Sequence, residues 1–177
     1  MTATLTQRRD LAEIIGSLAA AIRHGRLGPG DLAQLRRLSA ETPDQPAFWR
    51  VLSEWIAPDD SLPEEMERRW AVALAGLARL ASIGHHPECS FGAALARAGY
   101  SEMRLMRLLR ARPPQMGELM RQACSYLAAH AQPVNWVSIV AFVLTIDKDK
   151  AETVRRSVAR DYYSTVRREE GNKGRNK

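Results

Sequence analysis

The sequence of 177 residues has few features of an enzyme, a metal protein or a membrane protein. It contains only two cysteines, Cys89 and Cys124, and no apolar run of the roughly eighteen residues that a membrane-spanning helix needs. It also has no P-loop, GxGxxG fingerprint, HExxH motif or nucleophile elbow. We therefore predict no catalytic activity, no cofactor and no membrane partner. Because a signal peptide is also absent, we expect a cytoplasmic protein with reduced thiols.

One short segment, HHPEC, contains side chains of the kind that bind metal ions. His85, His86 and Cys89 lack a fourth ligand at a suitable spacing, and Pro87 interrupts them. We therefore interpret the segment as a loop and predict no metal site.

Strand signals are scarce, whereas helical periodicity extends along almost the whole chain. Apolar residues recur every three or four positions, and Gly and Pro lie between the runs. This pattern favours an all-α fold with about eight to nine helices. The segment VNWVSIVAFVLTI (134–146) is apolar on almost every side, so periodicity alone fits a buried helix or a strand. Its length and its helical neighbours favour a buried helix.

Capping residues mark several predicted helix ends. Asp31 and Ser101 are candidate N-caps, and Ser61 with Glu64 has the spacing of a capping box. We expect the first helix to cover about Thr6 to His24. Glycines are expected to close three helices: Gly25, Gly84 and Gly99.

The positive charge is concentrated in the second half of the chain. Residues 1–84 hold ten basic and eleven acidic residues, a net charge of −1, whereas residues 85–177 hold sixteen and nine, a net charge of +7. The change coincides with GHHPECS, which resembles a linker. We therefore predict two small helical bundles packed together, an N-terminal one over 1–84 and a basic C-terminal one over 85–168. Residues 169–177 form a predicted disordered tail, because GNKGRNK has no apolar residue.

The segment ETVRRSVARDYYSTVRREE (152–170) shows how the arginines are placed on a helix. Its apolar residues follow one another at four-residue steps: Val154, Val158, Tyr162 and Val166. Arg156, Arg160 and Arg167 fall on the opposite face, with Tyr163 beside them. Tyr163 is either a half-buried core residue or a platform on which a base stacks.

Arginines on other predicted helices also lie away from the apolar face. Arg37 and Arg107 point away from the leucines of their own helices, Arg36, Arg104 and Arg110 lie on the flanks, and Arg121 points outward from the next helix. Such faces are either solvated or bind phosphate, for which the guanidinium fork is well suited. We predict a surface that binds nucleic acid without reading bases, in a salt-dependent manner. Its arginines are Arg36, Arg37, Arg104, Arg107, Arg110, Arg121, Arg156, Arg160 and Arg167.

The order of five segments resembles the CasB family, the small subunit of the type I-E CRISPR Cascade complex. The segments are GDLAQLRRL, FWRVL, SEMRLMRLLRA, PVNWVSIVAFVL and RRSVARDYY, and the resemblance extends from about Gly30 to Tyr163. The family tends to carry an aromatic residue just before ARDYY, where this chain has Val158. Since Val158 lies on the apolar stripe, we expect this difference to change packing and not a ligand contact.

The resemblance implies an all-helical, non-catalytic subunit of two small bundles, present as two copies stacked head to tail. The implied partners are the backbone and large subunits of Cascade, guide RNA, and target DNA including the non-target strand. The implied role is to stabilise the R-loop in antiviral defence by holding the displaced strand on a basic face. Matched by motif, that face would contain Arg36, Arg37, Arg104, Arg107, Arg110, Arg156 and Arg160.

Two other functions fit the same sequence. One is a structural assembly adaptor whose arginines contact acidic protein surfaces, with no direct nucleic-acid contact. The other is a helical DNA-binding transcription regulator, although no recognition-helix pair or zinc finger points to sequence-specific reading.

Overall fold

Helices form almost all of the regular structure in the computed structural model, which describes residues 10–39, 43–58 and 61–175. This confirms the predicted all-α fold; within the described residues, one isolated β-bridge joins His85 and Val134. The first elements are α1 (Leu11–Arg23), α2 (Pro29–Arg36), α3 (Pro46–Val51), the π-helix η1 (Leu52–Ile56) and α4 (Glu64–Arg79). The others are α5 (Phe91–Arg97), α6 (Glu102–Arg110), α7 (Gln115–Ala129), α8 (Trp136–Leu144) and α9 (Lys148–Arg175).

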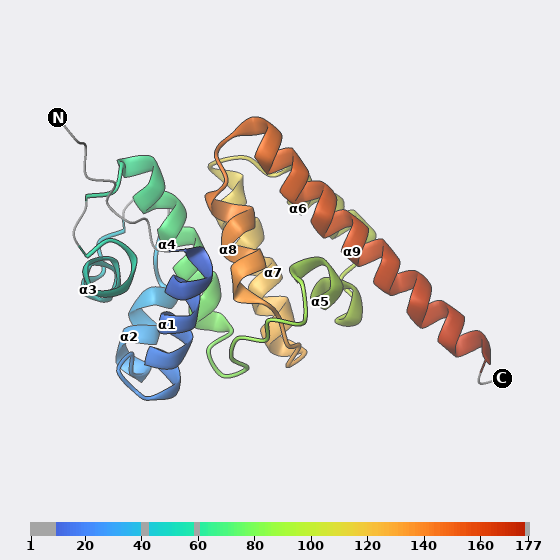
Figure 1. The fold of residues 1–177 in the computed structure, drawn as a ribbon, viewed down its shortest axis with the longest axis horizontal. Coiled ribbons are helices and arrows are strands. Elements are labelled where there is room, and N and C mark those ends of the chain that lie inside the picture. Colours follow the sequence, from blue (N-terminus) through green and yellow to red (C-terminus); the bar gives the residue numbers. More distant parts are fainter. Residues whose placement is uncertain (1–9, 40–42, 59–60, 176–177) are drawn as a thin grey trace.

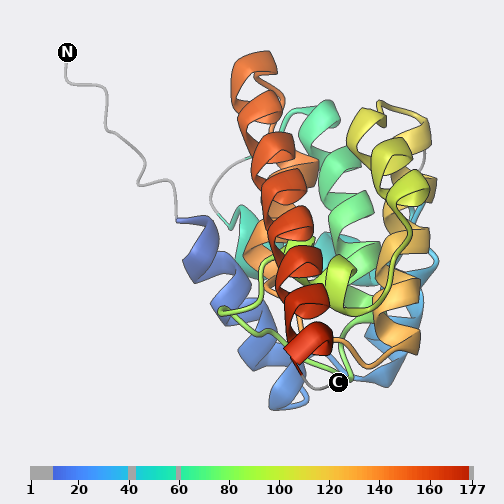
Figure 2. The same cartoon turned by 90° about the vertical axis from the view of Figure 1, so that its right-hand side faces the viewer.

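The helices are arranged in three regions along the molecule. Figure 1 shows α1, α2 and α3 with α4 at one end, α7 and α8 in the middle, and the long α9 at the other end. Figure 2 looks onto α9, which packs against α5 and also contacts α6 and α8. A single hydrophobic cluster extends from Ile14 in α1 to Tyr162 in α9, across the proposed boundary at residue 84. The division of the chain into two bundles stays a prediction.

The apolar segment after Pro133 is the buried helix α8, as predicted. The Asn135 side chain accepts a hydrogen bond from the Val137 backbone N–H (2.8 Å) and so caps the first turn. Contacts with α1, α4, α5 and α9 surround the helix, which explains why its sequence lacks a polar face. In the part of the chain that the structure describes, no helix is both long and apolar enough to cross a membrane.

Two of the predicted helix starts are wrong. α2 begins at Pro29, two residues before Asp31, because proline suits the first helical position; the Asp31 carboxylate accepts from the Gly28 N–H (3.1 Å). α4 begins at Glu64 without a side-chain cap, so Ser61 and Glu64 do not form a capping box. Leu62 precedes a proline, which disfavours helical geometry at that residue.

Most of the other predicted ends agree with the structure. Ser101 occupies the N-cap position of α6, although its side chain makes no capping hydrogen bond. Gly25 and Gly99 directly follow the C-caps of α1 and α5 with positive φ, 73° and 75°, as predicted. Gly84 also has a positive φ (88°), but it does not close α4, which ends at Arg79 with Leu80 as its C-cap. The predicted start of the first helix at Thr6 lies outside the described residues.

The last helix is longer than the sequence indicates. The sequence predicts disorder over 169–177, whereas α9 continues to Arg175, and residues 176–177 lie outside the described part. Glu169 and Glu170 are good helix formers, so the helix extends by adding residues to turns that already exist. Val158 is buried, as its place on the apolar stripe predicts.

Candidate nucleic-acid interface

The helix α6 buries one side and presents cations on the other. Leu105 and Leu108 are fully buried, and Leu109 is nearly so. Arg107 and Arg110 are exposed, and their guanidinium groups form no ion pair or hydrogen bond with any described residue. Both side chains therefore remain available to an anionic ligand.

Aromatic rings position a third arginine of α6. The Arg104 guanidinium carbon lies 5.7 Å from the centre of the Tyr126 ring and 6.0 Å from that of Tyr100. Tyr126 belongs to α7, and its hydroxyl donates to the Gly99 carbonyl oxygen (3.2 Å). These cation–π contacts hold Arg104 over the junction of α6 and α7 while it remains exposed.

An ion pair on α7 neutralises one of the predicted arginines. Arg121 donates to both carboxylate oxygens of Glu118, from Nε at 2.8 Å and from Nη2 at 2.6 Å, and Gln122 donates to Oε1 at 2.7 Å. The hydrogen bonds from Arg121 and then Gln122 lower the pKa of Glu118. The carboxylate is therefore ionised and already engaged.

Arg79, which the sequence did not single out, joins α4 to its neighbours. Its Nη2 donates to the Arg36 carbonyl oxygen (2.9 Å), while Arg36 Nε donates to the Ala78 carbonyl oxygen (3.0 Å). Burial lowers the pKa of Arg79, and the nearby charges of Arg121 and Arg36 lower it further. Three guanidiniums thus lie close together where α2, α4 and α7 meet. The available signal was an isolated arginine in the apolar run VALAGLARLA.

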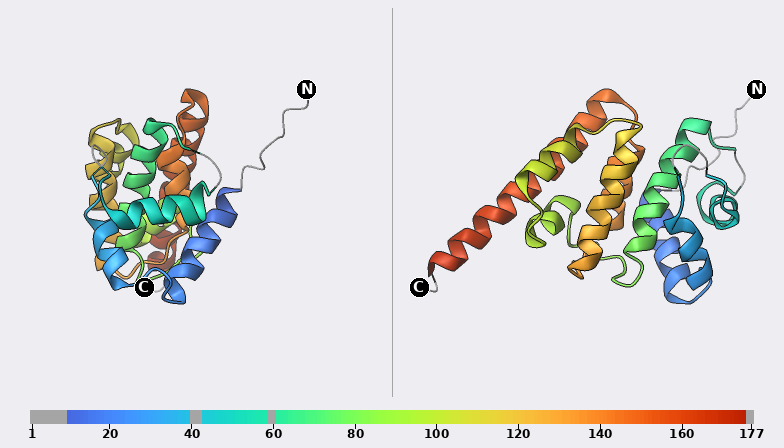
Figure 3. Two further views of the ribbon diagram at one scale, coloured as in Figure 1. Left: turned by 90° about the vertical axis from the view of Figure 1, so that its left-hand side faces the viewer. Right: turned by 180° about the vertical axis from the view of Figure 1, so that it is seen from behind.

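These contacts connect one group of cations across four helices. The helices α6 and α7 are in contact, as are α7 and α4, and α4 and α2; Figure 3 (right) shows them from behind. Glu118 is the carboxylate that pairs with Arg121 and lies near Arg79. We call this group the arginine band: Arg36, Arg37, Arg79, Arg104, Arg107, Arg110 and Arg121.

The remaining predicted arginines form a row on α9. Arg160 and Arg167 are exposed and have no side-chain partner among the described residues, whereas Arg156 pairs with Glu152 (3.2 Å). Tyr163 lies between Arg160 and Arg167 in the sequence of this helix and is 42% exposed. Its hydroxyl donates to Glu102 Oε1 at the start of α6 (2.7 Å). The structure thus places six of the nine predicted arginines in the arginine band and three in a neighbouring row.

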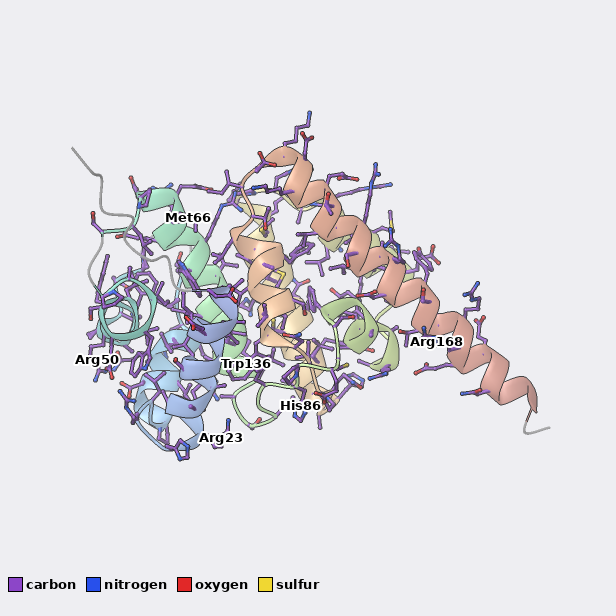
Figure 4. The ribbon with its side chains drawn as sticks, in the orientation of Figure 1. Arg23, Arg50, Met66, His86, Trp136 and Arg168 are labelled. Atoms are coloured by element: carbon purple, nitrogen blue, oxygen red, sulfur yellow. The ribbon has the colours of Figure 1, made fainter. Side chains whose placement is uncertain are left out.

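The HHPEC segment has structural contacts instead of an arrangement for metal binding. His85 Nδ1 accepts a hydrogen bond from the Trp136 N–H (3.1 Å), and buried Cys89 accepts from Arg97 through its Sγ (3.2 Å). Over the described ranges, no group of three or more His, Cys, Asp or Glu side chains is suited to a metal ion. Figure 4 labels His86 in the loop that follows α4 and Trp136 at the start of α8.

Comparison with known proteins identifies similar chains. The model of the family described as CRISPR-associated protein Cse2 matches residues 31–163. A chain in the crystal structure of E. coli Cascade bound to a PAM-containing double-stranded DNA target is 25% identical, with a TM-score of 0.66 over 87% of this chain and 97% of that chain. The crystal structure of M. ruber CasB has the same fold at 22% identity, with a TM-score of 0.63 over 86% of this chain and 95% of that one. A sequence comparison with curated proteins found no match.

Proposed function

Since this chain belongs to the family of CRISPR-associated protein Cse2, we propose that it is the non-catalytic small subunit of a type I-E Cascade surveillance complex. The match confirms the family resemblance on which the sequence-based prediction relied. The similarity to a chain of E. coli Cascade, over 97% of that chain, supports a place in such an assembly. The proposed partners are the backbone and large subunits, a second copy of the chain, guide RNA and target DNA in the cytoplasm.

The arginine band is the observation that carries the nucleic-acid part of the proposal. It presents seven arginines, of which Arg37, Arg107 and Arg110 have no side-chain partner in the described chain. Such a surface binds a phosphate backbone through charge-assisted hydrogen bonds and the release of counterions, without reading bases. The neighbouring α9 row extends the proposed site to all nine sequence-predicted arginines.

This chemistry suits the displaced strand of an R-loop. Forming an RNA–DNA duplex at the expense of a DNA duplex is nearly balanced in free energy, and re-annealing of the displaced strand opposes it. Arginines that hold the displaced non-target strand lower the free energy of the open state. The protein thereby stabilises the R-loop through binding alone, with no covalent step.

Charge reversal in the arginine band tests the proposal. We expect Arg107→Glu to weaken binding of the isolated chain to single-stranded DNA by roughly tenfold, because a charge-assisted hydrogen bond is lost. Arg23→Glu is the matched control; Arg23 is exposed on α1, away from α6 (Figure 4), and the substitution changes the net charge equally. Fluorescence anisotropy with a labelled strand measures both affinities.

The same variants separate the other two functions. If Arg107→Glu leaves DNA affinity unchanged but prevents assembly of the complex, the chain is a structural adaptor. If the wild-type chain prefers one DNA sequence over its scrambled form, a sequence-specific regulator is favoured.

A further inference from the structure

A groove lies between α6 and α7, inside the arginine band. Its volume is about 410 Å³, within the roughly 300–1,000 Å³ of small-ligand sites. It is therefore large enough for a group bulkier than a phosphate. Its lining includes Arg107, Arg110, Gln115, Glu118, Leu119 and Gln122.

The two walls of the groove differ in chemistry. The α6 wall carries the unpartnered guanidinium groups of Arg107 and Arg110. The α7 wall carries two amides, and Gln115 makes no side-chain hydrogen bond with any described residue. Gln122 uses its Nε2 for Glu118 (2.7 Å), which leaves its Oε1 able to accept a hydrogen bond.

Two further features suit the groove to a ligand that is anionic at one end and flat and apolar at the other. Leu119 is half-buried and supplies an apolar surface between the walls. Glu118 is held by Arg121 and Gln122, so its charge is largely compensated. A phosphate can thus approach the α6 wall without facing a free carboxylate.

We propose that this groove takes one unstacked nucleotide of a single strand, an inference that rests on the proposed function. The phosphate binds the Arg107 and Arg110 guanidiniums, and the base lies against Leu119 between the glutamine amides. An amide both donates and accepts hydrogen bonds, so each of the four bases finds a partner and the site tolerates any sequence. Bases in a duplex are stacked and paired, and extruding one costs free energy. The groove therefore selects single strands over duplexes.

The test uses short oligonucleotides of mixed sequence in which several positions carry 2-aminopurine, whose emission rises when it leaves the base stack. With the wild-type full chain we expect emission to rise on binding, and single strands to bind at least tenfold more tightly than the matching duplex. In Gln115→Ala/Gln122→Ala, which keeps every arginine, we expect a smaller rise and a several-fold smaller preference for single strands. Ser125→Ala is the control, because Ser125 is exposed on the same helix outside the groove.

The outcomes separate the two proposals. Circular dichroism and thermal unfolding first establish that the double variant is folded. If folded variant and wild type give equal emission and equal strand preference while binding still weakens in salt, the groove inference is overturned and the proposed function stands. The groove inference is likewise overturned, and the proposed function stands, if the double variant loses only assembly with protein subunits. The groove would then receive a protein side chain. If the wild-type chain shows no salt-dependent binding to either form of DNA, the proposed function itself fails.

Discussion

At the residue scale, His85 joins the loop after α4 to the first turn of α8. Its Nδ1 accepts a hydrogen bond from the Trp136 backbone N–H (3.1 Å), so this nitrogen carries no proton in the folded state. Burial lowers the pKa of His85, and the neighbouring His86 lowers it further. Protonation of Nδ1 would remove the acceptor and leave the N–H unpaired at the helix start.

This contact predicts a pH-dependent stability. Because the folded-state pKa of His85 lies below its ordinary 6.5, the unfolded chain binds more protons as the pH falls through that value, and the free energy of unfolding decreases. The contribution is complete well above pH 6.5 and is lost below it. Urea unfolding at a series of pH values from 8 to 5 measures the effect.

The control is His85→Asn, which retains a hydrogen-bond acceptor but does not titrate. In this variant we expect the free energy of unfolding to decrease less steeply as the pH falls. Subtracting one pH profile from the other removes the contributions of the other histidines. Equal slopes in the two proteins would show that His85 does not cause the pH dependence.

At the element scale, α9 packs closely on α5, and a glycine allows this approach. A Cβ atom at Gly92 would lie 2.1 Å from the Val158 carbonyl oxygen, which is backbone and does not rotate away. We expect Gly92→Ala to force the helices apart and to lower the free energy of unfolding by about 1–3 kcal/mol. Denaturant titration followed by circular dichroism measures this loss.

Gly16 in α1 provides the matched control. A Cβ atom there meets nothing within 4 Å, so Gly16→Ala adds only helix propensity and should stabilise the protein by about 0.5–1 kcal/mol. If both substitutions changed the free energy of unfolding in the same direction, the close packing of α5 on α9 would not explain the effect of Gly92→Ala.

The same scale shows what the sequence could predict. Periodicity located most helices, because it depends on which residues of one segment are buried. The segment of α8, whose pattern also fits a strand, was assigned to a helix from its length and its helical neighbours. The starts of α2 and α4 were wrong, because Asp31 and Ser61 each have a capping residue's chemistry but a nearby proline decides the start. The prediction that all nine arginines point outward also depended only on positions within single helices. All nine are exposed in the structure.

At the scale of the whole molecule, the grouping of the arginines depends on how the helices pack against one another. Hydrophobic periodicity within single segments does not predict that packing. Arg36 and Arg121 are 85 positions apart in the sequence, yet both lie near Arg79 because α2 and α7 each contact α4. The α9 row belongs to a different helix, which contacts α6 and is joined to it by the Tyr163–Glu102 hydrogen bond. Only the packed structure separates the predicted arginines into these two sets.

The central claim is that the arginine band binds a phosphate backbone, and a salt series on the isolated chain with single-stranded DNA tests it most directly. The logarithm of the binding constant should fall linearly with the logarithm of salt concentration, by about 0.7 for each phosphate contacted. For three or more contacts we predict a slope of about −2 or steeper. Arg107→Glu/Arg110→Glu removes two of these contacts and should make this slope shallower by about 1.4, while Arg23→Glu should not change it. A flat response in the wild type, or the same slope in the double variant, would contradict the account.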